Sequence, residues 1–145
     1  APLTFAHSAR SAEALPALFG AFLPDRHPLD SNVAYLLLFF GLSLLLLGRI
    51  RDIRPAAYAS FAAALLTTPM FHAWYATWLL PAAPGLRRSA AAVLSISSFV
   101  YFWLHVHIAE PGGAWRQSPL EKALLWSPFL AALLWDHLRE RRQNR

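Results

Sequence analysis

The chain has 145 residues, of which 57% are hydrophobic and 14% are charged, and its formal net charge is +5. Soluble domains carry about 25% charged residues, so this composition excludes an ordinary soluble protein and indicates an integral membrane protein. Cysteine is absent, which excludes disulfide bonds and thiolate metal sites from these residues.

The start of the chain carries no recognisable targeting signal. It begins at Ala1, its one methionine is Met70, and no basic region followed by a cleavage site is visible. This argues against a signal peptide. We therefore expect the chain to be the C-terminal part of a longer protein, with an N-terminal part that precedes Ala1.

Residues 1–31 are predicted to be an extracytoplasmic segment with an interfacial helix. Its apolar residues recur at the spacing of one helix face: Leu15, Leu18, Phe19 and Phe22. With Ser11 as the cap, this pattern predicts a short helix that lies flat on the membrane surface or packs on the outer ends of the spans. The polar stretch "PDRHPLD" follows at 24–30. It is either a solvated loop or a site in which Arg26 clamps a phosphate.

Residues 32–138 are predicted to form an all-α, polytopic membrane helix bundle, and residues 139–145 a basic cytoplasmic tail. A spanning helix needs about 20 mostly apolar residues. The apolar runs give about five membrane segments, which alternate in direction and start inward: 32–48, 55–68, 69–86, 89–109 and 120–138. The loop at 110–119 then lies outside.

The basic residues decide this topology because they cluster at the ends of the apolar runs. The clusters are Arg49, Arg51 and Arg54, then Arg87 and Arg88, and finally Arg139, Arg141, Arg142 and Arg145. All of them share the cytoplasmic side only if the chain turns at Pro69, as the positive-inside rule requires. The same placement argues against nucleic acid as a partner.

The segment 69–86 is the unusual one. Thr68 followed by Pro69 is typical of an N-cap with proline at the first helical position, so we expect a new helix to begin at Pro69. Pro81 and Pro84 interrupt it. A short span and a re-entrant half-helix both fit this pattern.

Four aromatic residues recur in this segment at i, i+3, i+4 and i+7: Phe71, Trp74, Tyr75 and Trp78. They are expected on one helix face, as a packing seam, an interfacial aromatic belt or the wall of a site. His72 favours a site because it lies in the first turn, near Tyr75. There the unpaired N–H groups of a helix start bind anionic groups such as phosphate.

The segment 89–109 adds a polar stripe. Ser98, Tyr101 and His105 are spaced i, i+3 and i+7, and we expect this face to point into the bundle. His105 and His107 are two residues apart, which is poor spacing for joint metal ligation on a helix. No metal site is therefore predicted. In the loop that follows, Arg116 is a second candidate phosphate clamp.

The stretch "TPMFHAWYATWLLP" at 68–81, followed by "AAPGLRRSAAAVLSISSFVYF", resembles the C-terminal signature of bacterial GT-C glycosyltransferases. The resemblance is to polyprenyl-phosphate-mannose-dependent mannosyltransferase-like membrane proteins. Its residues are His72, Trp74, Tyr75, Trp78 and the Leu-Pro that ends at Pro81. Ala73 stands where that family has a proline, and nothing here matches the first extracytoplasmic loop that carries the family's catalytic acidic residue.

The resemblance implies the lipid-carrier-facing part of such an enzyme, in a bacterial inner membrane. It would transfer a sugar, mannose, from a polyprenyl-phosphate donor to an acceptor at the extracytoplasmic face. His72, Trp74 and Tyr75 would line the donor site with Tyr101 and His105, assisted by Arg26 or Arg116, and no cofactor is expected. A non-enzymatic membrane scaffold and haem ligation by His72 and His105 stay open as alternatives.

Overall fold

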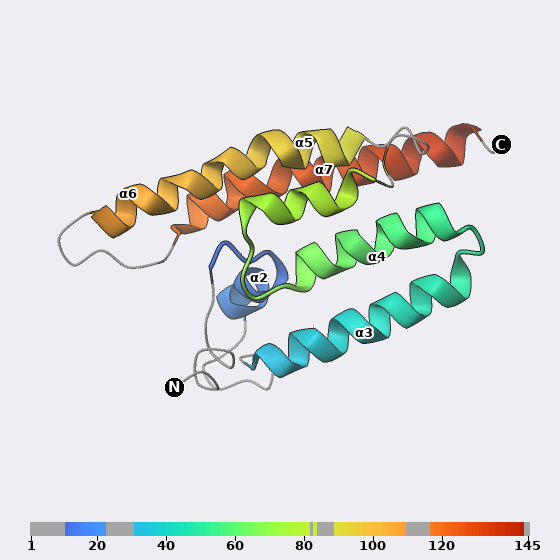
Figure 1. The fold of residues 1–145 in the computed structure, drawn as a ribbon, viewed down its shortest axis with the longest axis horizontal. Helices are drawn as coiled ribbons and strands as arrows, with labels where there is room; N and C mark the ends of the chain where they lie inside the picture. Colours follow the sequence, from blue (N-terminus) through green and yellow to red (C-terminus); the bar gives the residue numbers. More distant parts are fainter. Residues whose placement is uncertain (1–10, 23–30, 82, 84–88, 110–116, 144–145) are drawn as a thin grey trace. The chain divides into compact units, whose positions relative to one another are not determined.

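The computed structural model describes residues 11–22, 31–81, 83, 89–109 and 117–143. Throughout these ranges the chain is helical, apart from its connections and one isolated bridge (Figure 1). This confirms the predicted all-α class. The chain divides into two compact units, residues 1–71 and 72–145, which are described separately.

The first unit contains α2 (Leu15–Phe22), α3 (Asn32–Arg49) and α4 (Ile53–Thr67). A side-chain cap begins each of the two longer helices. Ser31 accepts a hydrogen bond from the Val33 N–H at 3.2 Å, and Asp52 accepts one from the Arg54 N–H at 3.1 Å. Such caps satisfy N–H groups that have no partner within the helix. The chain reverses its direction between α3 and α4, and these two helices pack side by side (Figure 1).

The predictions that Ser11 caps a helix and that a helix begins at Pro69 are both wrong. Ser11 and Met70 form a parallel β-bridge instead. The Ser11 N–H donates to the Pro69 carbonyl at 3.1 Å, and the Phe71 N–H donates to the Ser11 carbonyl at 2.9 Å. This pairing needs extended backbone at residues 69–71. Thr68 accordingly ends α4, donating its N–H to the Ala64 carbonyl at 2.9 Å.

The second unit begins with η2, a 3₁₀ helix at Ala73–Leu79. The elements α5 (Ser89–Ser97), η4 (Ser98–Phe102, 3₁₀) and α6 (Trp103–Ala109) follow one another without a break. The last element is α7 (Pro119–Gln143), which packs along this run (Figure 1). α7 is antiparallel to the run, because Glu121 contacts His107 and Asp136 contacts Ser89.

The interface within this antiparallel pair is a seam of buried residues at spacings of three and four. One side consists of Ala90, Leu94, Ser97, Tyr101 and Leu104, and the other of Glu121, Leu125, Phe129, Ala132 and Asp136. This spacing keeps a narrow stripe facing the partner helix. The alanines and Ser97 allow the two backbones to approach closely, as small residues do between helices in membranes.

By length and composition, two helices within the described ranges could cross a membrane, Asn32–Arg49 and Ser89–Ala109. They coincide with two of the predicted segments. The large apolar side chains of α3 are exposed, among them Leu37 and Leu44, as lipid-facing side chains would be. α7 contains the predicted segment 120–138 but is not one of these two helices. The five-segment bundle therefore remains a prediction.

The segment 69–86 differs most from its prediction. Its described part holds η2, seven residues of 3₁₀ helix, which at about 2.0 Å per residue is about 14 Å long. The hydrocarbon core of a bilayer is about 30 Å thick. The described part of the segment therefore holds no helix long enough to span a bilayer from Pro69, and both the short span and the re-entrant half-helix remain predictions.

Candidate functional site

A cluster of polar and aromatic side chains surrounds His72, the residue that precedes η2. His72 is the N-cap of this helix, and its carbonyl accepts the Tyr75 N–H at 2.9 Å. Its side chain makes no cap hydrogen bond. The imidazole is therefore available for contacts with other elements.

The imidazole of His72 is held by three rings. Nδ1 shares a hydrogen bond of 2.7 Å with the hydroxyl of Tyr101, a buried residue of η4. The imidazole stacks on Trp74 at 4.4 Å between centroids and 6° between planes, and it meets the Tyr75 ring edge-on at 5.3 Å. Four of the predicted site residues, His72, Trp74, Tyr75 and Tyr101, are thus brought together. One hydrogen bond thus links the residue that precedes η2 to η4.

The predicted single face of four aromatics does not form. Residues three apart eclipse in a 3₁₀ helix, so Tyr75 and Trp78 stack at 4.5 Å. Trp74 and Trp78 are 59% and 43% exposed, whereas Phe71 is completely buried in the first unit, before the helix starts. The predicted face assumes an α-helical period, and the 3₁₀ conformation of η2 changes that period.

The stripe predicted on 89–109 forms only in part. Ser98 and Tyr101 are buried, but His105 is exposed. The rings of Tyr101 and His105 still meet edge-on, with 6.4 Å between their centroids. Because Ser98–Phe102 is a 3₁₀ segment, the residues after it are rotated away from their α-helical positions.

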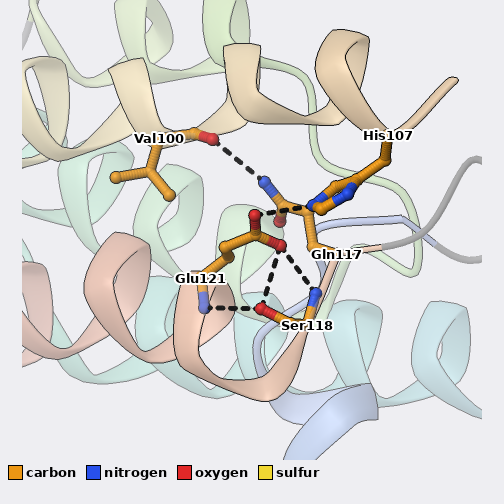
Figure 2. Close-up of polar contacts among 5 residues, drawn as sticks. All are labelled: Val100, His107, Gln117, Ser118 and Glu121. Atoms are coloured by element: carbon orange, nitrogen blue, oxygen red, sulfur yellow. Dashed lines mark hydrogen bonds and ion pairs between the residues drawn. The ribbon is translucent and has the colours of Figure 1, made fainter. Parts of the chain in front are cut away.

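A second polar cluster, which was not among the predicted sites, lies where α6 ends and α7 begins (Figure 2). His107 Nε2 lies 2.7 Å from Glu121 Oε1. The other carboxylate oxygen accepts the Ser118 N–H at 2.7 Å and the Ser118 hydroxyl at 3.0 Å, while the Glu121 N–H donates to Ser118 Oγ at 3.3 Å. The signal was present as "SPLE" at 118–121, a capping box with proline at the first helical position.

These contacts determine the charge state of Glu121, which lies outside both candidate spans. Burial by itself raises the pKa of its carboxyl. Hydrogen bonds from the Ser118 backbone, from His107 and from the Ser118 hydroxyl, together with the charge of His107, outweigh burial and hold that pKa below the ordinary 4.5. Glu121 is therefore ionised at neutral pH.

Gln117 connects this cluster to η4. Its Nε2 donates to the Val100 carbonyl at 3.3 Å (Figure 2). The side chain is buried, and its Oε1 has no hydrogen-bond partner among the described residues. Val100 directly precedes Tyr101, so the His72 and His107 clusters meet the same short 3₁₀ segment.

Asp136 is a third polar residue that the sequence analysis did not single out. It is buried, and its carboxylate accepts the Ser89 N–H at 3.1 Å, the Ser89 hydroxyl at 2.6 Å and the Ala90 N–H at 3.0 Å. Asp136 thus caps the start of α5, although it lies 47 positions after Ser89 in the chain. A cap supplied from another helix leaves no local sequence signal.

Two predicted site residues, Arg26 and Arg116, lie outside the described residues. Within the described ranges, no group of three or more histidine and carboxylate side chains could hold a metal ion. No protein family, curated protein or solved structure that we compared with this chain matches it.

Proposed function

We propose that this chain is the donor-binding part of a membrane glycosyltransferase. In this proposal the enzyme transfers a sugar, mannose, from a polyprenyl-phosphate carrier to an acceptor at the extracytoplasmic face of a bacterial inner membrane. The observation that carries the proposal is the hydrogen bond between His72 and Tyr101 beside the exposed ring of Trp74.

The chemistry of this cluster suits a sugar phosphate attached to a lipid. When the Tyr101 hydroxyl donates to Nδ1 of His72, the other ring nitrogen carries the remaining proton and can donate to a phosphate oxygen. The indole of Trp74 offers an apolar face with a polar N–H at its edge. Binding sites commonly combine such aromatic walls with a few convergent polar groups.

The proposal includes the five-segment topology, with the segment 69–86 as a half-length passage. The start of η2 lies beside Tyr101. After η2 the chain continues to Ser89, which begins the helical run that contains Tyr101 and lies twelve residues before Tyr101. This corresponds to about 18 Å along the helix axis. The chain therefore moves toward the end of the second unit where α7 carries Arg139, Arg141 and Arg142, the end that the positive-inside rule assigns to the cytoplasm.

The test is the substitution His72→Ala in the full-length protein. We expect this variant to lose binding of polyprenyl-phosphate-mannose and sugar transfer, while its membrane insertion stays unchanged. His137→Ala is the matched control, because His137 is an exposed histidine of α7 at the far end from Glu121. Normal binding and transfer by His72→Ala would contradict the proposal and favour a non-enzymatic scaffold.

A further inference from the structure

The last turns of α7 carry exposed basic side chains that the proposed sugar transfer does not use. Arg139, Arg141 and Arg142 are all exposed and belong to α7, which is helical to Gln143. Within the described ranges, none of the three arginines forms an ion pair. Their charges are therefore available to a partner outside the chain.

These arginines lie just beyond the end of a candidate span. The span Ser89–Ala109 begins at Ser89, whose hydroxyl donates to Asp136 at 2.6 Å. Because α7 is antiparallel to this span, the residues of α7 after Asp136 continue past the start of α5 (Figure 1). Arg142 follows Asp136 by six residues, which is less than two helical turns. With Ser89–Ala109 across a bilayer, these turns lie at the level of the lipid headgroups.

The exposed side chains of α7 change from apolar to basic at this level. Leu134, Trp135 and Leu138 are 59%, 62% and 45% exposed, and the arginines follow them directly. Tryptophan is enriched where the hydrocarbon core meets the headgroups. Arginine keeps its methylene stem along apolar surface and extends its charge into the polar layer. This order along α7 follows the polarity of a bilayer from its core to its headgroups.

Two of the arginines share a helix face with the tryptophan. Trp135, Leu138, Arg139 and Arg142 are spaced i, i+3, i+4 and i+7, and all four are exposed. Residues at this spacing are neighbours on the surface of an α-helix. We call these four residues the Arg139 face. It combines two guanidinium groups with an adjacent apolar surface, which suits a ligand that has both a phosphate group and acyl chains.

The nearby carboxylates leave this positive charge in place. Asp136 is buried and accepts hydrogen bonds from Ser89 and Ala90 at the start of α5. Glu140, the other carboxylate in these turns, is only partly exposed. A guanidinium group binds phosphate oxygens through two parallel N–H donors. Basic residues next to a span also attract the anionic lipids of the cytoplasmic leaflet.

We propose that the Arg139 face binds an anionic phospholipid of the cytoplasmic leaflet. Arg139 and Arg142 contact the phosphate group, while Trp135 and Leu138 contact the upper part of the acyl chains. In the proposed topology this end of the second unit is cytoplasmic, where basic clusters next to spans meet anionic lipids. Lipid binding here goes beyond the proposed transfer and does not depend on it.

The test is a competition between two phospholipids for the full-length protein in a neutral detergent. Equal amounts of phosphatidylglycerol, which is anionic, and phosphatidylcholine, which has no net charge, are added, and native mass spectrometry measures how much of each stays bound. We expect the unchanged protein to prefer phosphatidylglycerol. Arg139→Gln and Arg142→Gln should each lower that preference by about fivefold, the effect of one basic residue near an anionic surface.

Two further variants separate a lipid site from general attraction by charge. Lys122→Gln is the matched control, because it removes one positive charge at the other end of α7, and it should keep the preference. The double variant Arg139→Lys/Arg142→Lys keeps both charges and should retain most of it.

Three results would overturn the proposal. Equal binding of both lipids by the unchanged protein would show that this face has no anionic lipid as its partner and would favour an acidic protein segment. An undiminished preference in Arg139→Gln and Arg142→Gln would place the lipid elsewhere. Equal losses in Lys122→Gln and Arg142→Gln would show that net charge alone attracts the lipid.

Discussion

Asp136 is the residue that most clearly ties the second unit together. It is 3% exposed and accepts hydrogen bonds from two backbone N–H groups and one hydroxyl at the start of α5. A carboxylate at a helix N-terminus also interacts favourably with the helix dipole. The buried charge is therefore compensated, although the sequence shows only an aspartate near the end of an apolar run.

We predict that Asp136→Ala lowers the unfolding temperature of the protein in detergent, as measured by circular dichroism. Each buried donor left without an acceptor costs about 1–3 kcal/mol. Asp136→Asn keeps a hydrogen-bond acceptor, so its unfolding temperature should lie between those of Asp136→Ala and the unchanged protein. His137→Ala, on the neighbouring exposed residue, is the control. Equal unfolding temperatures for Asp136→Ala and this control would contradict the assigned cap.

At the scale of elements, the sequence predicted the long helices well. The predicted segment 89–109 matches the run Ser89–Ala109, and 32–48 matches Asn32–Arg49. Hydrophobic composition and length are properties of the segment itself, so they can be read locally. The extended residues 69–71 could not be predicted, because their conformation depends on pairing with Ser11, which is distant in sequence.

The same distinction applies to the candidate site. Trp74 and Tyr75 could be placed near His72 because they are its neighbours in the chain. The contact of Tyr101 with His72 joins residues 29 apart and could not be read from spacing. The capping box at Ser118 is a local pattern, so the sequence alone is sufficient to predict it.

The start of α7 depends on this capping box. We predict that Ser118→Ala destabilises the protein by about 1 kcal/mol, the typical cost of losing an N-cap side chain. Ser118→Thr should retain most of the stability. The measurement is the midpoint of denaturant unfolding, with Ser127→Ala, at an exposed position inside α7, as the control. A loss no larger than that of the control would mean that Ser118 does not stabilise the helix start.

Glu121 should also make this helix start sensitive to acid. Its pKa in the folded protein is below the ordinary 4.5 because its hydrogen bonds outweigh burial. A group of this kind stabilises the fold fully above its unfolded pKa, and the contribution disappears as the pH falls through the folded value. When the pH is lowered below 4.5, we expect the unfolding temperature of Glu121→Gln to decrease less than that of the unchanged protein. Identical acid profiles would contradict this assignment.

For the whole molecule, the passage between α4 and α5 decides the topology. The described ranges contain four long helical segments: α3, α4, the α5–α6 run and α7. If these four crossed alone, the Arg49 and Arg139 clusters would lie on opposite sides of the membrane. The positive-inside rule favours a shared side, and this requires the segment 69–86 to move the chain across despite its short 3₁₀ helix.

The absence of cysteine allows this topology to be tested with single cysteines, because each introduced thiol is then the only one in these 145 residues. We predict that Arg51→Cys and Arg141→Cys react with a membrane-impermeant maleimide only from the cytoplasmic side. Ala114→Cys, in the predicted outer loop, should react only from the other side and is the internal control. Each positive cluster keeps its other arginines in these variants, so orientation should be unchanged. Labelling of Arg51→Cys and Arg141→Cys from opposite sides would show an odd number of crossings between the two positions and would make 69–86 a re-entrant segment that returns to the side from which it entered.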